Sequence, residues 1–97
     1  MPLNGQAYRF DQQTVQTVNE VGGVYGLARY EQNTYYILYV GESVNLRRRL
    51  TEHLNNPPAR GITHFFAEVI PNQAQRLARE TVLIQEFNPV GNTVGRD

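Results

Sequence analysis

The chain has 97 residues, the length of a single domain with an adequate but modest hydrophobic core. Nine arginines, with no lysine, balance nine acidic residues, and this zero net charge argues against strong, indiscriminate binding of nucleic acid. Cysteine is absent, which excludes disulfides, thiolate metal ligands and a cysteine nucleophile, and which fits a cytoplasmic protein. No apolar run approaches the roughly 18 residues of a membrane-spanning helix, so we expect neither a membrane partner nor a secretory leader.

Apolar periodicity and turn residues divide the chain into short helices and strands. In chain order we expect a short helix capped by Asp11 and ending at Gly22-Gly23, strands at 23–30 and 35–40 around a polar turn, a helix at 45–54, a strand at 64–70 and a helix at 73–87. The two strands joined by the turn most simply form an antiparallel hairpin. The pattern predicts an α+β fold in one domain, 1–97, with its core at 22–92 and residues 1–21 as an N-terminal extension.

The helix expected at 45–54 carries three consecutive arginines beside a stripe of leucines. Arg49 flanks that stripe one turn before His53, so both side chains point the same way at the edge of the core. Arg47 and Arg48 are most simply solvated residues on the helix surface. Arg49 can be interpreted in the same way. The position of a cation and an imidazole beside the core nevertheless makes Arg49 and His53 a candidate functional pair.

The helix expected at 73–87 places a carboxylate within its apolar face. That face is formed by Leu77, Thr81 and Ile84, and widened by Leu83, Phe87, Ala74 and Ala78. A carboxylate at Glu80 loses hydration there and must find a partner, take up a proton or bind a cation. Arg76, one turn back, is an available partner and would make Glu80 structural. Alternatively, a single carboxylate can hold a hard divalent ion such as Mg²⁺, with waters and a substrate phosphate completing its coordination.

Four stretches together resemble the GIY-YIG nuclease superfamily. They are GVY at 23–25, YVG at 39–41, NLRRRLTEHL at 45–54 and RETVLIQEFNPVGN at 79–92. Either tripeptide alone carries little information. Three features make the resemblance specific. The stretches occur in the family's order, an arginine lies ten residues beyond the second tyrosine, and a glutamate lies twelve residues before the closing asparagine. It covers about residues 22–92 and implies a small standalone endonuclease domain, with a three-stranded antiparallel sheet flanked by helices.

The resemblance also implies the chemistry and the residues that perform it. The implied catalytic set is Tyr25, Tyr39, Arg49, His53 and Glu80, with Glu80 binding one Mg²⁺ or Mn²⁺ per active site. Gly41, Arg47 and Asn92 are the candidate substrate-binding residues, and Asn92 is expected mainly to pin the last turn near Glu80. Gly41 has no side chain, so backbone, phosphate and metal can approach closely there.

The implied reaction is metal-dependent hydrolysis of DNA phosphodiester bonds that leaves 5′-phosphate and 3′-hydroxyl ends. Ionising a tyrosine at pH 7 costs about 4 kcal/mol unless cations offset it, and Arg49 and the metal are such cations. We favour Tyr39 as the general base, although relatives differ between the two tyrosines, and Tyr25 or His53 could accept or relay the proton. Arg49 suits the charge that develops on the phosphate oxygens.

Two features depart from the family pattern. Glu42 occupies a position that is often lysine in DNA-repair members, which replaces a phosphate-facing cation by an anion. We also expect no DNA-recognition domain, so that specificity comes from the module itself, from homodimerisation or from an accessory protein. The alternative function is therefore a nucleic-acid-binding, repair-associated module without turnover. The sequence leaves open whether the substrate is single-stranded, branched or duplex DNA, or RNA, and whether the role is in DNA repair or restriction.

Overall fold

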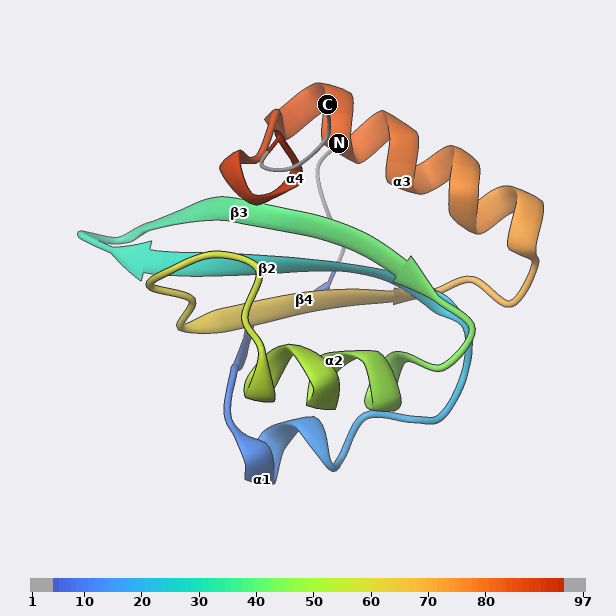
Figure 1. Ribbon diagram of the computed structural model, residues 1–97, viewed down its shortest axis with the longest axis horizontal. Coiled ribbons are helices and arrows are strands. Elements are labelled where there is room, and N and C mark those ends of the chain that lie inside the picture. Colours follow the sequence, from blue (N-terminus) through green and yellow to red (C-terminus); the bar gives the residue numbers. More distant parts are fainter. Residues whose placement is uncertain (1–4, 94–97) are drawn as a thin grey trace.

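A four-stranded antiparallel sheet lies at the centre of the fold in the computed structural model, which describes residues 5–93 (Figure 1). Its strands are β1 (Tyr8–Arg9), β2 (Gly23–Glu31), β3 (Thr34–Ser43) and β4 (His64–Val69), in the spatial order β1-β4-β2-β3. The hairpin β2–β3 and the α+β class are as the sequence predicts. Strand β2 is therefore enclosed between two neighbours, and β3 forms one edge of the sheet.

The expectation of three strands was wrong, because residues 8–9 add a fourth. Tyr8 pairs with Phe65 and Arg9 with His64, and the N–H of Phe10 donates to the carbonyl of Thr63 at 2.9 Å. These bonds satisfy backbone groups on the outer edge of β4 that would otherwise need water. A strand of two residues is too short to show alternation, so the sequence predicts only a lead-in there.

The helices cover both sides of the sheet. They are α1 (Gln12–Val15), α2 (Leu46–Asn55), α3 (Gln73–Phe87) and α4 (Val90–Thr93). Helices α1 and α2 lie on one side, and α3 and α4 lie on the other, next to β3 (Figure 1). Within residues 5–93, no helix is both long and apolar enough to cross a bilayer.

Side-chain caps set where the helices begin. Asp11, Asn45 and Asn72 each accept a hydrogen bond from the backbone N–H three residues later. Helix α3 has the predicted bounds and ends at Asn88, whose left-handed φ of 45° closes its last turn. Helix α1 is much shorter than expected and stops after Val15, which is fully buried in the core.

Alternation along β2 divides the core between the two faces of the sheet. Tyr25 and Leu27 point toward α2, whereas Val24, one position before Tyr25, contacts the side that α3 covers. The α2 side contains Val15, Tyr25, Leu27, Leu46, Leu50 and Phe65, and the α3 side contains Val24, Val40 and Leu83. One tyrosine of the family pattern is thus a core residue.

The inward face of α3 differs from the predicted one. Leu77 is 44% exposed, whereas Arg76 is only 5% exposed. Ala74, Ala78 and Thr81 are also exposed, and the helix turns Arg76, Glu80 and Leu83 toward the sheet instead. Apolar periodicity did not predict this face because the first half of the face is charged. The residues that contact the face also belong to strands distant in the sequence.

Candidate active site

The site lies at the edge of the sheet where β3 reaches Gly41. Tyr25 of β2 is the register partner of Gly41, and its phenol end lies directly over that glycine. A Cβ on residue 41 would come within 2.5 Å of Cζ of Tyr25, so any other residue would displace the ring. The close approach predicted at Gly41 is therefore made by a tyrosine of the same chain, and contact with substrate there stays a prediction.

Helix α2 brings His53 to this tyrosine. The Tyr25 hydroxyl and His53 Nε2 are 2.8 Å apart, a hydrogen-bond distance, and both residues are buried. Tyr39 of β3 completes an aromatic cluster, with its ring centroid 6.3 Å from that of Tyr25 and 5.3 Å from that of His53. Tyr39 and His53 lie 14 and 28 positions after Tyr25 in the sequence. The fold brings these three residues together at one edge of the sheet.

Arg49 lies one turn before His53 on the same side of α2. Its Nη1 donates to Oε1 of Glu52 at 2.8 Å, and the guanidinium also interacts with the Tyr25 hydroxyl. The hydrogen bond with Glu52 raises the pKa of Arg49 above its ordinary value, so the cation is permanent. Arg48 also lies near Glu52, but farther from it, at 4.0 Å.

Burial keeps both partners of the Tyr25–His53 hydrogen bond neutral at pH 7. Desolvation, followed by the nearby Tyr39, raises the pKa of Tyr25 well above its ordinary value, and the Arg49 cation offsets this only in part. Desolvation, followed by the charge of Arg49, lowers the pKa of His53 to about 4. Tyr25 can therefore donate its hydroxyl proton to a neutral imidazole.

Glu80 reaches the same edge from α3. It is half-buried, and it lies near enough to Tyr25 for its charge to contribute to the raised pKa of that phenol. No group of three or more His, Cys, Asp or Glu side chains suited to a metal ion exists among residues 5–93, and the carboxylate that acts on Tyr25 at this edge is that of Glu80. That donor set fits a hard ion such as Mg²⁺, which keeps several waters and needs few protein ligands.

Arg76, the predicted structural partner of Glu80, is engaged elsewhere. Its Nε donates to Oε1 of Glu42 at 3.0 Å, and its Nη1 donates to the carbonyls of Ile70 and Pro71 at 3.3 and 2.7 Å. Glu42, the anion at the often-lysine position, is thus balanced by a buried guanidinium. The departure from the family pattern does not leave an uncompensated negative charge at the site.

An open pocket of about 360 Å³ exposes this cluster to solvent. It is lined by Tyr39, Arg49, Glu52, His53, Asn56, Pro57 and Pro58. Tyr39 faces the pocket, whereas Tyr25 is 1% exposed and lies behind it. A ligand in the pocket would meet Tyr39 and Arg49 first. Sequence reasoning missed Glu52 and the two prolines as parts of the site, although the spacing of three between Arg49 and Glu52 is a usable signal.

Two predicted substrate-binding residues have structural contacts. Asn92 is buried, and its side-chain amide makes two hydrogen bonds with the backbone of Val40, at 2.7 and 2.8 Å, which fasten α4 to β3 beside Gly41. Arg47 points toward the segment that follows α1, where its Nε donates to the carbonyl of Val18 at 2.7 Å. The structure therefore does not bring Arg47 to the pocket, and the substrate contacts of both residues stay predictions.

Phenols, a guanidinium, an imidazole and a carboxylate at one sheet edge are groups suited to hydrolysis of a phosphate ester. Residues 21–94 match the sequence model of the GIY-YIG catalytic domain. The chain belongs to the GIY-YIG family of nuclease domains, as its sequence pattern predicts. No match was found among curated proteins.

Solved structures share the fold of this chain. The magnesium-bound GIY-YIG N-terminal endonuclease domain of UvrC from Thermotoga maritima is 22% identical, with a TM-score of 0.68 over 81% of this chain and 91% of that one. Two point mutants of that domain, each bound to its catalytic divalent cation, are 21% identical with TM-scores of 0.66. The first covers 79% of this chain and 88% of its own, and the second covers 81% and 91%.

Proposed function

We propose that this protein is a metal-dependent endonuclease that hydrolyses DNA phosphodiester bonds and leaves 5′-phosphate and 3′-hydroxyl ends. The observation that carries the proposal is the pocket in which Tyr39, Arg49 and His53 meet, with Glu80 at the same sheet edge. The catalytic divalent cation in the UvrC domain supports a cation at Glu80.

Arg49 is the residue proposed to bind the scissile phosphate. Its guanidinium can make two parallel hydrogen bonds to the non-bridging oxygens, where negative charge grows as water attacks phosphorus. Glu52 lines the same pocket and accepts a hydrogen bond from the guanidinium at 2.8 Å. This ion pair orients the cation in advance, so less reorganisation is needed when the phosphate arrives.

Tyr39 is the proposed general base. It faces the pocket, whereas the buried Tyr25 has a raised pKa and a hydrogen bond to His53 that favours its protonated form. Ionisation of a tyrosine at pH 7 costs about 4 kcal/mol in water, so the base needs a cation nearby, and Arg49 lines the same pocket. Tyr25 and His53 then act as the buried partners that fix the orientation of Tyr39 and relay its proton.

Glu80 would hold one Mg²⁺ or Mn²⁺ at the side of the leaving group. When bound, the ion supplies positive charge that stabilises the leaving 3′-oxygen. The Glu42–Arg76 pair anchors α3 one turn before Glu80, and it thereby fixes the carboxylate relative to Tyr25. A single carboxylate leaves the remaining coordination positions to waters and to the substrate phosphate.

Cleavage assays test this function directly. Purified protein is incubated with single-stranded, branched and duplex DNA in the presence of Mg²⁺, Mn²⁺ or EDTA. We expect cleavage only with metal, and we expect Glu80→Ala and Arg49→Ala to lower the rate by about 10²-fold or more, since each removes charge stabilisation in the transition state. Arg48→Ala is the matched control, because Arg48 lies on the exposed side of α2.

Equal behaviour of the wild type and all three variants on every substrate would rule out the nuclease function. Binding of DNA without cleavage would instead support the module without turnover. The anion at Glu42, which favoured that alternative, is paired with Arg76 and no longer supports it.

A further inference from the structure

A second cavity lies next to the catalytic pocket. It has a volume of about 540 Å³, within the range of small-molecule sites, and the loop between α2 and β4 forms most of its wall. It is lined by Phe10, Pro57, Pro58, Ala59, Arg60, Gly61 and Ile62 and is called the loop cavity below. Pro57 and Pro58 line both the loop cavity and the catalytic pocket, so the two spaces share part of their wall.

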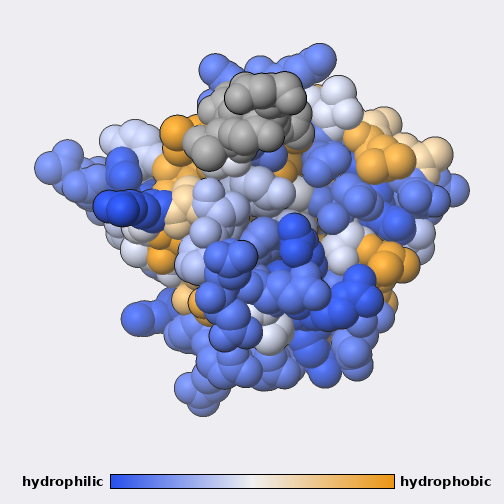
Figure 2. Space-filling model, in the orientation of Figure 1, coloured by the Kyte–Doolittle hydropathy of each residue, from blue (hydrophilic) through white to orange (hydrophobic). Residues whose placement is uncertain are grey.

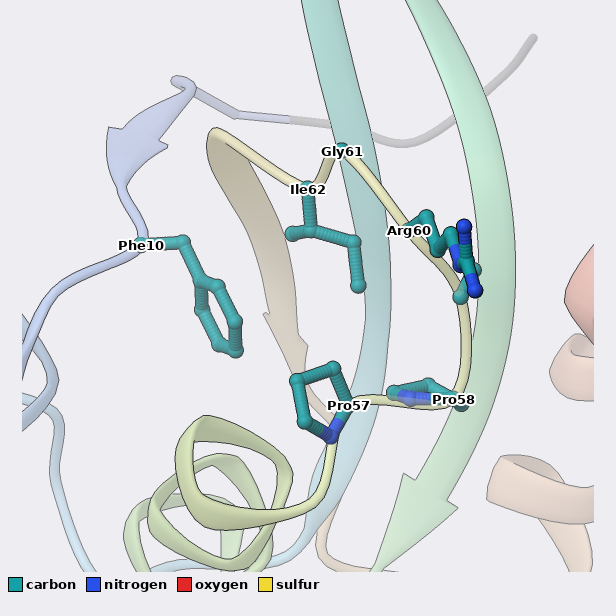
Figure 3. A pocket seen from close by; sticks show the side chains of 7 residues that line it. Phe10, Pro57, Pro58, Arg60, Gly61 and Ile62 are labelled. Atoms are coloured by element: carbon teal, nitrogen blue, oxygen red, sulfur yellow. The ribbon is translucent and has the colours of Figure 1, made fainter.

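The interior of the loop cavity suits a flat, apolar group. The side chains of Phe10, Pro57 and Ile62 surround it (Figure 3). Phe10 is held in place from behind, because its ring meets that of Phe65 edge-on at 6.5 Å and its N–H donates to the carbonyl of Thr63. A fixed aromatic ring opposite a proline offers two flat surfaces between which another ring can stack.

The rim of the loop cavity carries a guanidinium that is available for an anion. Within residues 5–93, Arg60 is the one arginine without a carboxylate oxygen from that segment inside 4.0 Å. Its side chain projects toward β3, where it also lines a smaller cavity beside Leu38 (Figure 3). In a chain of zero net charge whose other described arginines have acidic neighbours, Arg60 is the position best suited to a phosphate.

We propose that the loop cavity binds an unpaired nucleobase of the strand whose scissile phosphate occupies the catalytic pocket, and that Arg60 binds the adjoining phosphate. This inference rests on the proposed function, because it assumes that a nucleic-acid strand reaches Arg49. A base within a duplex is stacked on both sides and cannot enter a cavity, whereas an unpaired base can stack on an aromatic ring. The protein therefore prefers substrates with unpaired nucleotides beside the cut.

Binding without turnover tests the proposal. Fluorescence anisotropy in EDTA measures the affinity of a labelled oligothymidine and of a duplex that contains it. We expect the single strand to bind more tightly than the duplex. Phe10→Leu should weaken single-strand binding by about fivefold or more, since it keeps apolar contact but removes the stacking ring. Arg60→Gln should weaken it by about two- to fivefold and reduce its salt dependence.

Arg9→Gln is the matched control. Arg9 is another exposed arginine and is next to Phe10 in the sequence. It is the register partner of His64, whereas the next residue of β4, Phe65, faces α2. Because side chains alternate along a strand, Arg9 lies on the opposite face of the sheet from α2. This variant should bind like the wild type. The inference is overturned if Arg60→Gln and Phe10→Leu bind like Arg9→Gln, if the duplex binds as tightly as the single strand, or if no strand binds. Arg60 is on an exposed loop, so its variant remains informative even if Phe10→Leu is poorly folded.

The cleavage assay separates this inference from the proposed function. Metal-dependent cleavage that is unaffected by Phe10→Leu and Arg60→Gln would leave the nuclease function standing and would refute the loop cavity as a base site. Strand binding that depends on both residues, in a protein that cuts nothing, would support the loop cavity and refute the nuclease function.

Discussion

Gly41 and Tyr25 show how one residue without a side chain shapes the whole site. The phenol of Tyr25 crosses the edge strand over Gly41 and reaches the region between His53 and Glu80. Because Tyr25 is buried and neutral, its hydroxyl is a fixed hydrogen-bond donor rather than a readily ionised group. The base that we propose is therefore Tyr39, which belongs to the same aromatic cluster but faces the open pocket.

The buried imidazole of His53 predicts a specific acid sensitivity of the fold. Its pKa is lowered from 6.5 to about 4, so the unfolded chain takes up a proton in this range that the folded chain does not. The stabilising contribution is complete above pH 6.5 and is lost as the pH falls toward 4, with a total approaching about 3 kcal/mol. Urea unfolding of the wild type across this range measures the loss.

His53→Gln is the comparison for that experiment. Glutamine does not titrate, and its side-chain oxygen can still accept the hydroxyl proton of Tyr25. The free energy of unfolding of His53→Gln should therefore depend less steeply on pH between 4 and 6.5 than that of the wild type. Identical pH dependence in the two proteins would show that His53 does not have the lowered pKa.

At the scale of elements, the position of α3 depends on a buried ion pair. Arg76→Gln leaves Glu42 without its cation and removes donors from the carbonyls of Ile70 and Pro71, so we expect a loss of about 2–3 kcal/mol in unfolding free energy. Glu42→Gln keeps an acceptor and should cost about 1 kcal/mol. Thermal or urea unfolding measures both losses.

The exposed pair Arg48–Glu52 is the control for the buried one. Its atoms are 4.0 Å apart and both side chains are more than half exposed, so Arg48→Gln should change stability by no more than about 0.5 kcal/mol. A loss of stability in Arg76→Gln as small as that in Arg48→Gln would show that the Arg76 contacts do not anchor α3.

Helix α3 shows which features of the fold could be predicted from the sequence and which could not. The bounds of α3 follow from Asn72, which caps it, and from Asn88-Pro89, which ends it, and both signals are local. Its inward face is not local, because Arg76 is buried by an acidic partner 34 residues away in β3. Similarly, Arg49 and His53 are neighbours through helical spacing alone, but the hydrogen bond from Tyr25 to His53 needs the folded sheet.

At the scale of the whole molecule, the balance of charge limits how nucleic acid can bind. The net charge is zero, and the face in Figure 2 is largely hydrophilic, with apolar residues in separate patches. Most arginines of the protein are within 4.0 Å of a carboxylate, and Arg47 points toward the segment that follows α1. Affinity must then come from a few well-placed contacts rather than from a broad positive field.

This limit predicts a shallow dependence of binding on salt. If Arg49 and Arg60 are the two phosphate contacts, the slope of log K against log salt concentration for a single strand should be about −1.4, since each contact contributes about −0.7. Anisotropy titrations in EDTA at several salt concentrations measure the slope. Arg60→Gln should halve it, and Arg9→Gln should leave it unchanged. A slope steeper than about −3 would require phosphate contacts beyond this pair, and the strand would then follow a wider surface than the two adjoining pockets.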